Sequence, residues 1–299
     1  MIQVHRLWHA TFETPDVQRQ ADYYSEVVGL QVIRDGDRAI LLSAVGEEAV
    51  IFKPGSAPRC TSIALQVAPG TELNDIASAL RQHAVQAECR SDISPSLPAA
   101  MVFTDPKGTE IELFTDARPH DSRPVGGVAP LKLGHIAFLV PDAKAISDFY
   151  IQVLGFRVSD WIEDYFAFLR CSPDHHTLNF ISGTGAFMHH FAFELNDWSH
   201  LRTACDVLTR HKRPLIWGPG RHGVGHNVFV YHRDPDDHII EFFAEMDQMK
   251  DESLGYFEPR PWHHDYPQRP KVWERKYSGI TWGPPPTADF LRNQSRTAD

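Results

Sequence analysis

The chain has 299 residues, enough for one large or two ordinary domains, and its 42% hydrophobic and 23% charged residues are typical of a globular protein. Its net charge of −10 argues against a general DNA- or RNA-binding protein, because such a protein needs a basic face. The sequence has no run of about 18 apolar residues, no apolar signal region at its start and no Cys-x-x-Cys pair. We therefore expect a cytoplasmic protein with reduced thiols that binds neither nucleic acid nor a membrane.

An internal repeat organises the chain. The segment HATFETPDVQRQADYYSEVVGLQVI, from His9, matches HIAFLVPDAKAISDFYIQVLGFRVS, from His135. Each copy predicts a short strand, then a helix capped by the aspartate of a Pro-Asp pair, then a glycine that ends the helix in a left-handed conformation. Apolar runs after the glycines predict further strands at residues 39–42, 50–52, 166–169 and 177–181.

Weaker copies of the same unit follow each strong one. The first has strands near 61–67 and 100–104 around a helix near 73–83. The second has strands near 190–195 and 227–232 around a helix near 198–211. Both copies end with an Asp-Pro turn and an alternating strand that carries Glu112 or Glu241. The predicted fold class is α+β, with two domains that each contain two paired βαβββ modules.

The repeat also predicts the domain boundaries. We expect an N-terminal domain at 1–118 that supports the structure without a metal site, and a catalytic domain at 130–245. A linker rich in proline, glycine and charge runs near 115–131. The remaining segment, 246–299, is rich in proline and aromatic residues, and we expect it to wrap a domain or a neighbouring subunit. Its tryptophans are Trp262, Trp273 and Trp282.

Three strand positions of the second domain predict a metal site. His135 begins HIAFLV and His190 begins HFAFEL, so both match H-x-A-F and should occupy equivalent places on paired modules. Glu241 lies on the last strand of the fourth module. Two imidazoles and one carboxylate with open coordination positions suit non-haem Fe(II) oxygenases. His189 is the rival of His190, but side chains alternate along a strand and the H-x-A-F match selects His190.

A single strand histidine is more often a hydrogen-bonded core residue than a ligand, so the first domain serves as a control. Its equivalents of the three candidate ligands are His9, Ser62 and Glu112. Because a serine replaces the second imidazole, we expect no tight metal site there. His9 and Glu112 are then relics of the repeat or packing groups.

The closing segment, from His222 through GVGHNVFVYHRDPDDHIIE to Glu241, carries a family resemblance. It has a Gly-x-His, a spacer, an apolar residue before Tyr231, an Asp-Pro turn and the glutamate. Together with HHTLNF and MHHFAFEL, it resembles the type I extradiol dioxygenases of the vicinal oxygen chelate superfamily over roughly residues 1–245. That family cleaves catechols next to the two hydroxyls with O2 and forms a ring-opened semialdehyde or keto acid.

The resemblance implies roles for individual residues. The metal, Fe(II) or less often Mn(II), would be held by His135, His190 and Glu241. His176 would be the active-site acid/base, and His222 and Tyr231 would hydrogen-bond the oxygens of the substrate. The substrate would be a small aromatic diol, with O2 as co-substrate, and the chain would form a homo-oligomer and act in aromatic hydrocarbon catabolism.

Some positions depart from the family pattern or lack a role. Asp237 stands where the family usually has glycine, a mild change because aspartate tolerates left-handed backbone. The loop before His190 is one residue short, which leaves His175 and His176 open as alternatives for the acid/base. For His226 and His232 we expect surface positions.

Three other functions remain open from the sequence. Glyoxalase-like isomerases and transferases use similar modules with a metal, but do not require the His176, His222 and Tyr231 set. A ligand-sequestering protein of the same superfamily would need no metal. A structural zinc site would use the same ligands, although two histidines and one glutamate leave an open position that favours catalysis.

Overall fold

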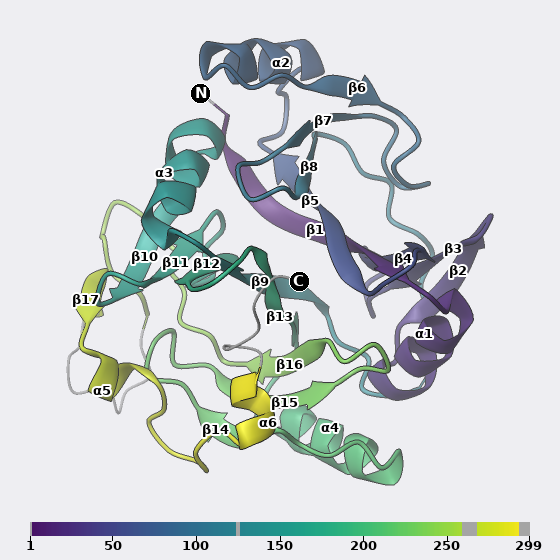
Figure 1. The fold of residues 1–299 in the computed structure, drawn as a ribbon, viewed down its shortest axis with the longest axis vertical. Coiled ribbons are helices and arrows are strands. Elements are labelled where there is room, and N and C mark those ends of the chain that lie inside the picture. The colour runs from purple at the N-terminus through teal and green to yellow at the C-terminus, as the bar shows by residue number, and fades with distance from the viewer. Residues whose placement is uncertain (1, 124–125, 259–267, 293–299) are drawn as a thin grey trace. The chain divides into compact units, whose positions relative to one another are not determined.

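The computed structural model describes residues 2–123, 126–258 and 268–292. The chain divides into two compact units, Met1–Leu133 with Phe149–Gly155 and Gly134–Asp148 with Phe156–Asp299. Each unit is built on one mixed sheet with few helices (Figure 1). The expected α+β fold of paired βαβββ modules is confirmed, because each sheet contains two such modules in chain order.

The first unit has an eight-stranded sheet with strand order β2-β3-β4-β1-β5-β8-β7-β6. The two modules join where β1 pairs antiparallel with β5. Within each module the first strand pairs parallel with the last, β1 with β4 and β5 with β8. The elements are β1 (Val4–Thr14), α1 (Val17–Tyr23), a π-helical turn (Tyr24–Val28), β2 (Gln31–Asp35), β3 (Arg38–Leu42), β4 (Glu48–Pro54), β5 (Arg59–Val67), α2 (Leu73–Gln82), β6 (Glu88–Arg90), β7 (Ala100–Thr104) and β8 (Glu110–Phe114).

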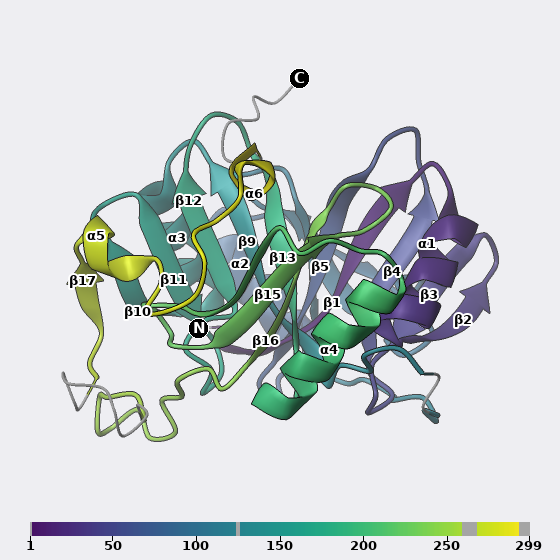
Figure 2. The same cartoon turned by 90° about the horizontal axis from the view of Figure 1, so that it is seen from below.

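The second unit repeats this plan and adds one strand at the edge of its sheet, giving the order β14-β15-β16-β13-β9-β12-β11-β10-β17. Helix α4 packs on β15 and β16 (Figure 2). The elements are β9 (Lys132–Val140), α3 (Ala143–Leu154), β10 (Arg157–Ile162), β11 (Phe166–Arg170), β12 (Leu178–Ser182), β13 (Phe187–Glu194), α4 (Trp198–Arg210), β14 (Trp217–Arg221), β15 (Val228–Arg233), β16 (Ile239–Ala244), β17 (Lys271–Trp273), α5 (Arg275–Ser278) and α6 (Ala288–Arg292). The part of α3 from Phe149 onward belongs to the first unit.

The predicted helix signals of the repeat are confirmed in both copies. The Asp16 side chain accepts a hydrogen bond from the backbone N–H of Arg19 at 2.9 Å, and Asp142 accepts one from Ala145 at the same distance. These bonds satisfy N–H groups that the first helical turn leaves free. After each helix a glycine takes a left-handed conformation, with φ of 83° at Gly29 and 75° at Gly155.

The Asp-Pro turn before β16 fixes the start of the strand that carries Glu241. The Asp234 carboxylate accepts from the backbone N–H groups of Asp236 and His238, each at 2.9 Å. Asp237 has φ of 69°, so the expectation that aspartate tolerates the left-handed backbone here is confirmed. The first unit builds the matching turn in the same way, because Asp105 accepts from the N–H groups of Lys107 and Thr109.

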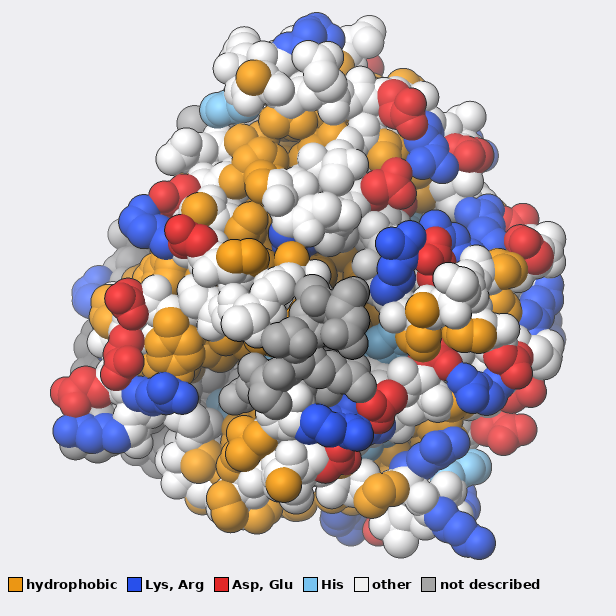
Figure 3. Space-filling view, in the orientation of Figure 1, with side chains coloured by type: hydrophobic (Ala, Val, Ile, Leu, Met, Phe, Trp, Pro, Cys, Tyr) orange, Lys and Arg blue, Asp and Glu red, His pale blue; other side chains and the backbone are white. Residues whose placement is uncertain are grey.

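The C-terminal segment lies on the second unit. Strand β17 pairs parallel with β10 at the sheet edge, and Figure 1 shows α6, in yellow, beside β15. Trp262 lies outside the described residues. On the face shown in Figure 3, lysine and arginine side chains are interspersed with aspartate and glutamate. Within the ranges the structure describes, no helix is both long and apolar enough to cross a bilayer.

The expected surface positions of His226 and His232 are wrong, because the two side chains are only 5% and 0% exposed. His226 Nδ1 lies 2.6 Å from the Asp247 carboxylate, which belongs to the C-terminal segment. His232 lies on β15 and stacks on Phe242, with ring centroids 4.9 Å apart. The polar character of histidine suggested exposure, but His226 has a buried carboxylate as its partner and His232 has an aromatic neighbour.

We predict that His232 makes the fold sensitive to acid. Burial lowers its pKa from 6.5 to about 3, so between these values the unfolded chain binds a proton that the folded protein does not. The free energy of unfolding should therefore decrease as the pH falls below 6.5, with His232 contributing a loss of about 2 kcal/mol between pH 6.5 and 5. Urea unfolding of His232→Gln across this range should show a shallower pH dependence.

The exposed His83 provides the matched control. His83→Gln should keep the pH dependence of the wild-type protein. A His232→Gln variant whose unfolding free energy falls with acid as steeply as that of the wild type would contradict the assignment.

Candidate metal centre

Three neighbouring strands bring His135, His190 and Glu241 together. His135 lies on β9, His190 on β13 and Glu241 on β16, and β13 is the strand between the other two. In the parallel pair of β13 and β16, Ala192 is the partner of Glu241. Because side chains alternate along a strand, His190 and Ala192 share a face, which is the face that carries Glu241. The opposite face of β13 carries Phe191 and Phe193, which are both fully buried.

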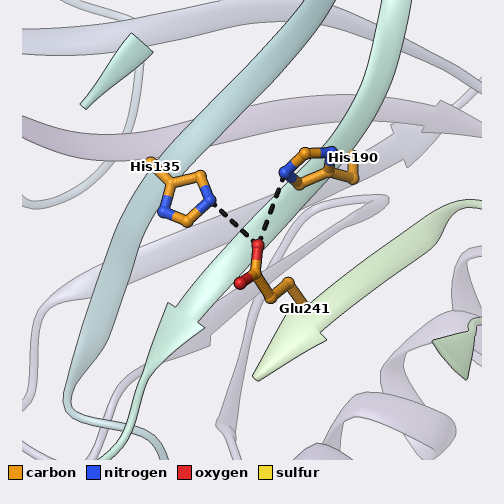
Figure 4. A group of neighbouring side chains, drawn as sticks. All are labelled: His135, His190 and Glu241. Atoms are coloured by element: carbon orange, nitrogen blue, oxygen red, sulfur yellow. Dashed lines mark hydrogen bonds and ion pairs between the residues drawn. The ribbon is translucent and has the colours of Figure 1, made fainter. Parts of the chain in front are cut away.

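Figure 4 shows the Glu241 carboxylate between the two imidazoles. Glu241 Oε2 lies 3.0 Å from His135 Nε2 and 3.5 Å from His190 Nε2. One donor atom from each residue lies within 4.8 Å of the others, and all three residues are buried. Within the part of the chain that the structure describes, this is the one group of at least three His, Cys, Asp or Glu residues with such spacing.

The electrostatics of the group favour the protonation states that a cation needs. Burial alone would raise the pKa of Glu241, but the charge and hydrogen bond of His135, with hydrogen bonds from His190 and His222, hold it well below its usual range. Burial lowers the pKa of His190. Glu241 is therefore a carboxylate and His190 a neutral imidazole, the forms in which these side chains coordinate metals.

The residues fit a divalent metal ion with open coordination positions. Two imidazole nitrogens and one carboxylate oxygen, all converging on a small buried volume, form a donor set suited to Fe(II) or Mn(II). Both imidazoles approach the same oxygen of Glu241, Oε2. A metal ion at this point would balance the negative charge of the buried carboxylate.

His176 faces the metal centre and His175 turns away from it. The His176 ring centroid lies 4.4 Å from that of His135, and His176 lines the adjacent cavity. His175 Nε2 instead lies 3.0 Å from the Asp160 carboxylate, on the other side. Burial, followed by the nearby His135 and His175, lowers the pKa of His176 well below its usual value. The geometry thus distinguishes two residues that the sequence left as alternatives.

His222 and Tyr231 lie on the other side of Glu241. The Tyr231 hydroxyl donates to Glu241 Oε2 at 2.8 Å and lies 3.0 Å from His222 Nε2. Burial, then the neighbouring Glu241, raises the pKa of Tyr231 well above its usual value, so the phenol remains a hydrogen-bond donor. His222 Nδ1 lies 3.1 Å from the carbonyl oxygen of Gly279, which ties this histidine to the C-terminal segment.

Two further residues orient the candidate ligands and were not predicted from the sequence. Asn227 donates from Nδ2 to Glu241 Oε1 at 2.9 Å. Asn227 precedes Phe229 by two residues and Tyr231 by four, so the three side chains point to the same side of an extended segment. This spacing could have identified Asn227 from the sequence. His189, considered only as a rival, lies with Nδ1 2.7 Å from His190 Nδ1 and restricts the orientation of that ring.

The first unit arranges the equivalent residues differently. His9 Nε2 lies 3.1 Å from Glu112, while His9 Nδ1 lies 3.6 Å from Glu48. The two carboxylates therefore contact opposite nitrogens of one imidazole and do not converge on a common point. Ser62, which replaces the second histidine, lies beside Glu112 and helps to lower its pKa against the effect of burial.

A cavity of about 590 Å³ opens from the candidate metal centre. Its polar lining includes all three candidate ligands together with His176, His222 and Tyr231. The apolar lining comes mostly from β10, β11 and the C-terminal segment, and includes Ile162, Phe166, Phe168 and Phe290. The predicted site residues therefore share one partly apolar cavity, large enough for an aromatic ligand of one or two rings.

Comparison with known proteins gives a consistent result. Residues 132–242 match the model of the Glyoxalase/Bleomycin resistance protein/Dioxygenase superfamily. Metapyrocatechase 2 of Cupriavidus necator is 25% identical, over 82% of each chain. A manganese-dependent 2,3-dihydroxybiphenyl 1,2-dioxygenase of Geobacillus genomosp. 3 is 23% identical, over 91% of this chain and 94% of the relative. An iron-dependent extradiol dioxygenase of Rhodococcus jostii is 25% identical, over 89% and 98%.

Solved structures share the fold over the whole chain. Homoprotocatechuate 2,3-dioxygenase of Brevibacterium fuscum, in complex with 3,4-dihydroxyphenylacetate, superposes with a TM-score of 0.83 at 22% identity and covers 100% of this chain and 94% of that one. The Mn(II)-bound glyoxalase of Novosphingobium aromaticivorans has the same TM-score at 20% identity, with 100% and 96% coverage. Residues 132–242 of this chain are therefore similar to the glyoxalase/bleomycin resistance protein/dioxygenase superfamily, and the chain has the vicinal oxygen chelate fold.

Proposed function

We propose that this protein is an extradiol ring-cleaving dioxygenase that uses O2 to open a catechol-type aromatic diol to a semialdehyde or keto acid. The observation that carries the proposal is the convergence of His135, His190 and Glu241 in the cavity that His176, His222 and Tyr231 also line. Relatives named as catechol and biphenyl-diol dioxygenases support it.

In this proposal His135, His190 and Glu241 hold Fe(II), with Mn(II) as the alternative because the relatives include enzymes named for either metal. When bound, the metal supplies a Lewis acid that helps to ionise the diol, and a redox-active centre for the reaction with O2. Tyr231 and Asn227 hold Glu241 by hydrogen bonds to its two oxygens, and His189 restricts His190. These contacts keep the coordinating atoms oriented before the substrate arrives.

The other residues of the cavity position the substrate and move protons. His176 is neutral and faces the centre, so it can accept a proton from a diol hydroxyl and later return it to a departing oxygen. His222 and Tyr231 form a hydrogen-bonded pair that can bind the oxygens of the diol. The aromatic and aliphatic lining excludes water and holds the ring in one orientation, which brings both reactants together.

The second candidate function is a glyoxalase-like isomerase or transferase, because the Mn(II)-bound glyoxalase shares the fold. It ranks lower because isomerisation does not require the His176, His222 and Tyr231 set. A ligand-sequestering protein ranks lower still, because such a protein has no need for a buried group of metal-binding side chains. We also propose a cytoplasmic location, supported by four free cysteines, and a homo-oligomeric state.

The activity is tested by anaerobic reconstitution with Fe(II), followed by a panel of mono- and bicyclic catechols. We expect O2 uptake equal to the diol consumed, a coloured ring-opened product, and incorporation of both atoms of ¹⁸O₂ into it. Isomerisation of a thiol adduct of a 2-oxoaldehyde without O2 uptake would instead identify the glyoxalase-like enzyme. A fully metal-loaded protein that consumes no O2 with any diol would also contradict the proposal.

The internal repeat supplies a matched pair for the metal site. We expect His135→Ala to reduce bound Fe(II) or Mn(II) to background, because it removes one of three protein ligands. His9→Ala removes the repeat-equivalent histidine of the first unit and should leave the metal content unchanged. Elemental analysis after dialysis measures both variants. Full metal content in His135→Ala would contradict the ligand assignment.

If His176 is the acid/base, its replacement should lower kcat without changing the metal content. We expect His176→Phe to lower kcat by about 10²- to 10⁴-fold, the usual contribution of a positioned acid/base. Metal content should remain that of the wild type, because His176 is not among the three converging side chains. Steady-state oxygen uptake at saturating diol, with elemental analysis of the same sample, provides the test. A kcat within a few-fold of wild type would exclude this role.

A further inference from the structure

A chain of buried hydrogen bonds leads away from the metal centre behind His176. His176 Nδ1 lies 3.0 Å from His175 Nδ1, and His175 Nε2 lies 3.0 Å from Asp160 Oδ2. The three residues are between 1% and 4% exposed. Asp160 lies on β10 and is the member of this hydrogen-bonded series that lies farthest from the cavity. The proposed reaction uses only His176, so the presence of His175 and Asp160 behind it requires a separate explanation.

The C-terminal segment fixes the hydrogen-bonding role of Asp160. The backbone N–H of Lys271 donates to Oδ1 and the indole Nε1–H of Trp273 donates to Oδ2, each at 2.8 Å. Both contacts come from β17, which pairs with β10 beside Asp160. Because an N–H group can only donate here, both oxygens of Asp160 act as acceptors, as those of a carboxylate do.

This arrangement sets the direction of every hydrogen bond in the chain. Since Asp160 Oδ2 is an acceptor, the proton of His175 lies on Nε2, and in a neutral His175 the Nδ1 atom carries a lone pair. The contact between the two Nδ1 atoms then requires His176 to donate from its own Nδ1. The remaining nitrogen of a neutral His176, Nε2, is consequently left as an acceptor toward the cavity.

Close packing keeps both imidazoles in this geometry. A Cβ atom at Gly225 would lie 3.3 Å from His175 Nδ1 and 3.3 Å from His176 Cε1, so the glycine backbone covers the pair of rings. The backbone N–H of His175 donates to the Asp247 carbonyl at 2.9 Å, and the Phe257 ring lies 4.7 Å from the imidazole. Asp247 and Phe257 both belong to the C-terminal segment.

We propose that Asp160 is a positioning residue that, through His175, fixes the orientation and tautomer of His176. Trp273 and Lys271 complete the device from the C-terminal segment. It presents Nε2 of His176 as a base to the diol before the reaction begins. The consequence for catalysis rests on the proposed function, whereas the tautomer itself does not.

The test uses the full-length protein with ¹⁵N-labelled histidine. It is measured in two samples, one without metal and one loaded with diamagnetic Zn(II). Long-range ¹H–¹⁵N spectra distinguish protonated from unprotonated ring nitrogens, and the spectrum of His176→Gln identifies the signals of His176. In the wild type we expect the proton on Nδ1. In Asp160→Asn an NH2 group replaces one of the two acceptor oxygens, and when it faces His175 Nε2 it reverses the hydrogen bonds and moves the His176 proton to Nε2.

Activity supplies the second readout. Asp160→Asn should lower kcat by about 10- to 100-fold with little change in KM or metal content, as expected when an orienting partner is lost. Trp273→Phe, which removes one donor to Asp160 but keeps the aromatic ring, should lower kcat in the same way and to a smaller extent. Trp282→Phe makes the same change in the C-terminal segment at a side chain that is 43% exposed, and it should leave kcat unchanged.

The two hypotheses fail in different ways. A wild-type His176 protonated on Nε2, or an Asp160→Asn variant that keeps both the tautomer and the kcat of the wild type, would overturn the positioning role even in an active dioxygenase. A wild type with the expected tautomer that turns over no diol would overturn the proposed function and leave the hydrogen-bond chain established. If Asp160→Asn does not fold, the tautomer of the wild type and the comparison of Trp273→Phe with Trp282→Phe still decide the matter.

Discussion

The second unit depends on one electrostatic constraint, the burial of the Glu241 carboxylate between two imidazoles. A buried carboxylate is costly unless it is paired and hydrogen-bonded. Here Tyr231 and Asn227 donate to its two oxygens, and His135 and His190 approach the oxygen that faces the cavity. The fold meets this requirement by placing three neighbouring strands, β9, β13 and β16, so that their side chains converge from one face of the sheet.

The C-terminal segment contacts the residues around the candidate metal centre and lines part of its cavity. Phe290 of α6 packs on Tyr231, with ring centroids 4.9 Å apart, and the carbonyl of Gly279 accepts from His222. Strand β17 reaches Asp160 and, through His175, acts on His176 from behind. Both sides of the centre are thus supported by residues that follow the last βαβββ module. The segment therefore belongs to the chemistry of the cavity as well as to the packing of the unit.

The sequence predicted the parts that recur within it. The repeat and its Pro-Asp and glycine signals indicated the βαβββ modules, and repeat equivalence identified His135 and His190 as a pair. Contacts that join distant segments left no periodic signal. Asp160 meets Lys271 across 111 residues, and the same aspartate contacts His175 on the side away from the candidate metal centre. His226 and His232 were expected at the surface because their buried neighbours, Asp247 and Phe242, could not be inferred from local pattern.

The most direct test of the central claim is anomalous diffraction at the manganese edge from crystals of the full chain grown with Mn(II). The account predicts one strong peak per chain, within coordination distance of Nε2 of His135, Nε2 of His190 and a carboxylate oxygen of Glu241. A peak at the His9 and Glu112 pair of the first unit, or no peak at the three converging side chains at saturating Mn(II), would contradict it.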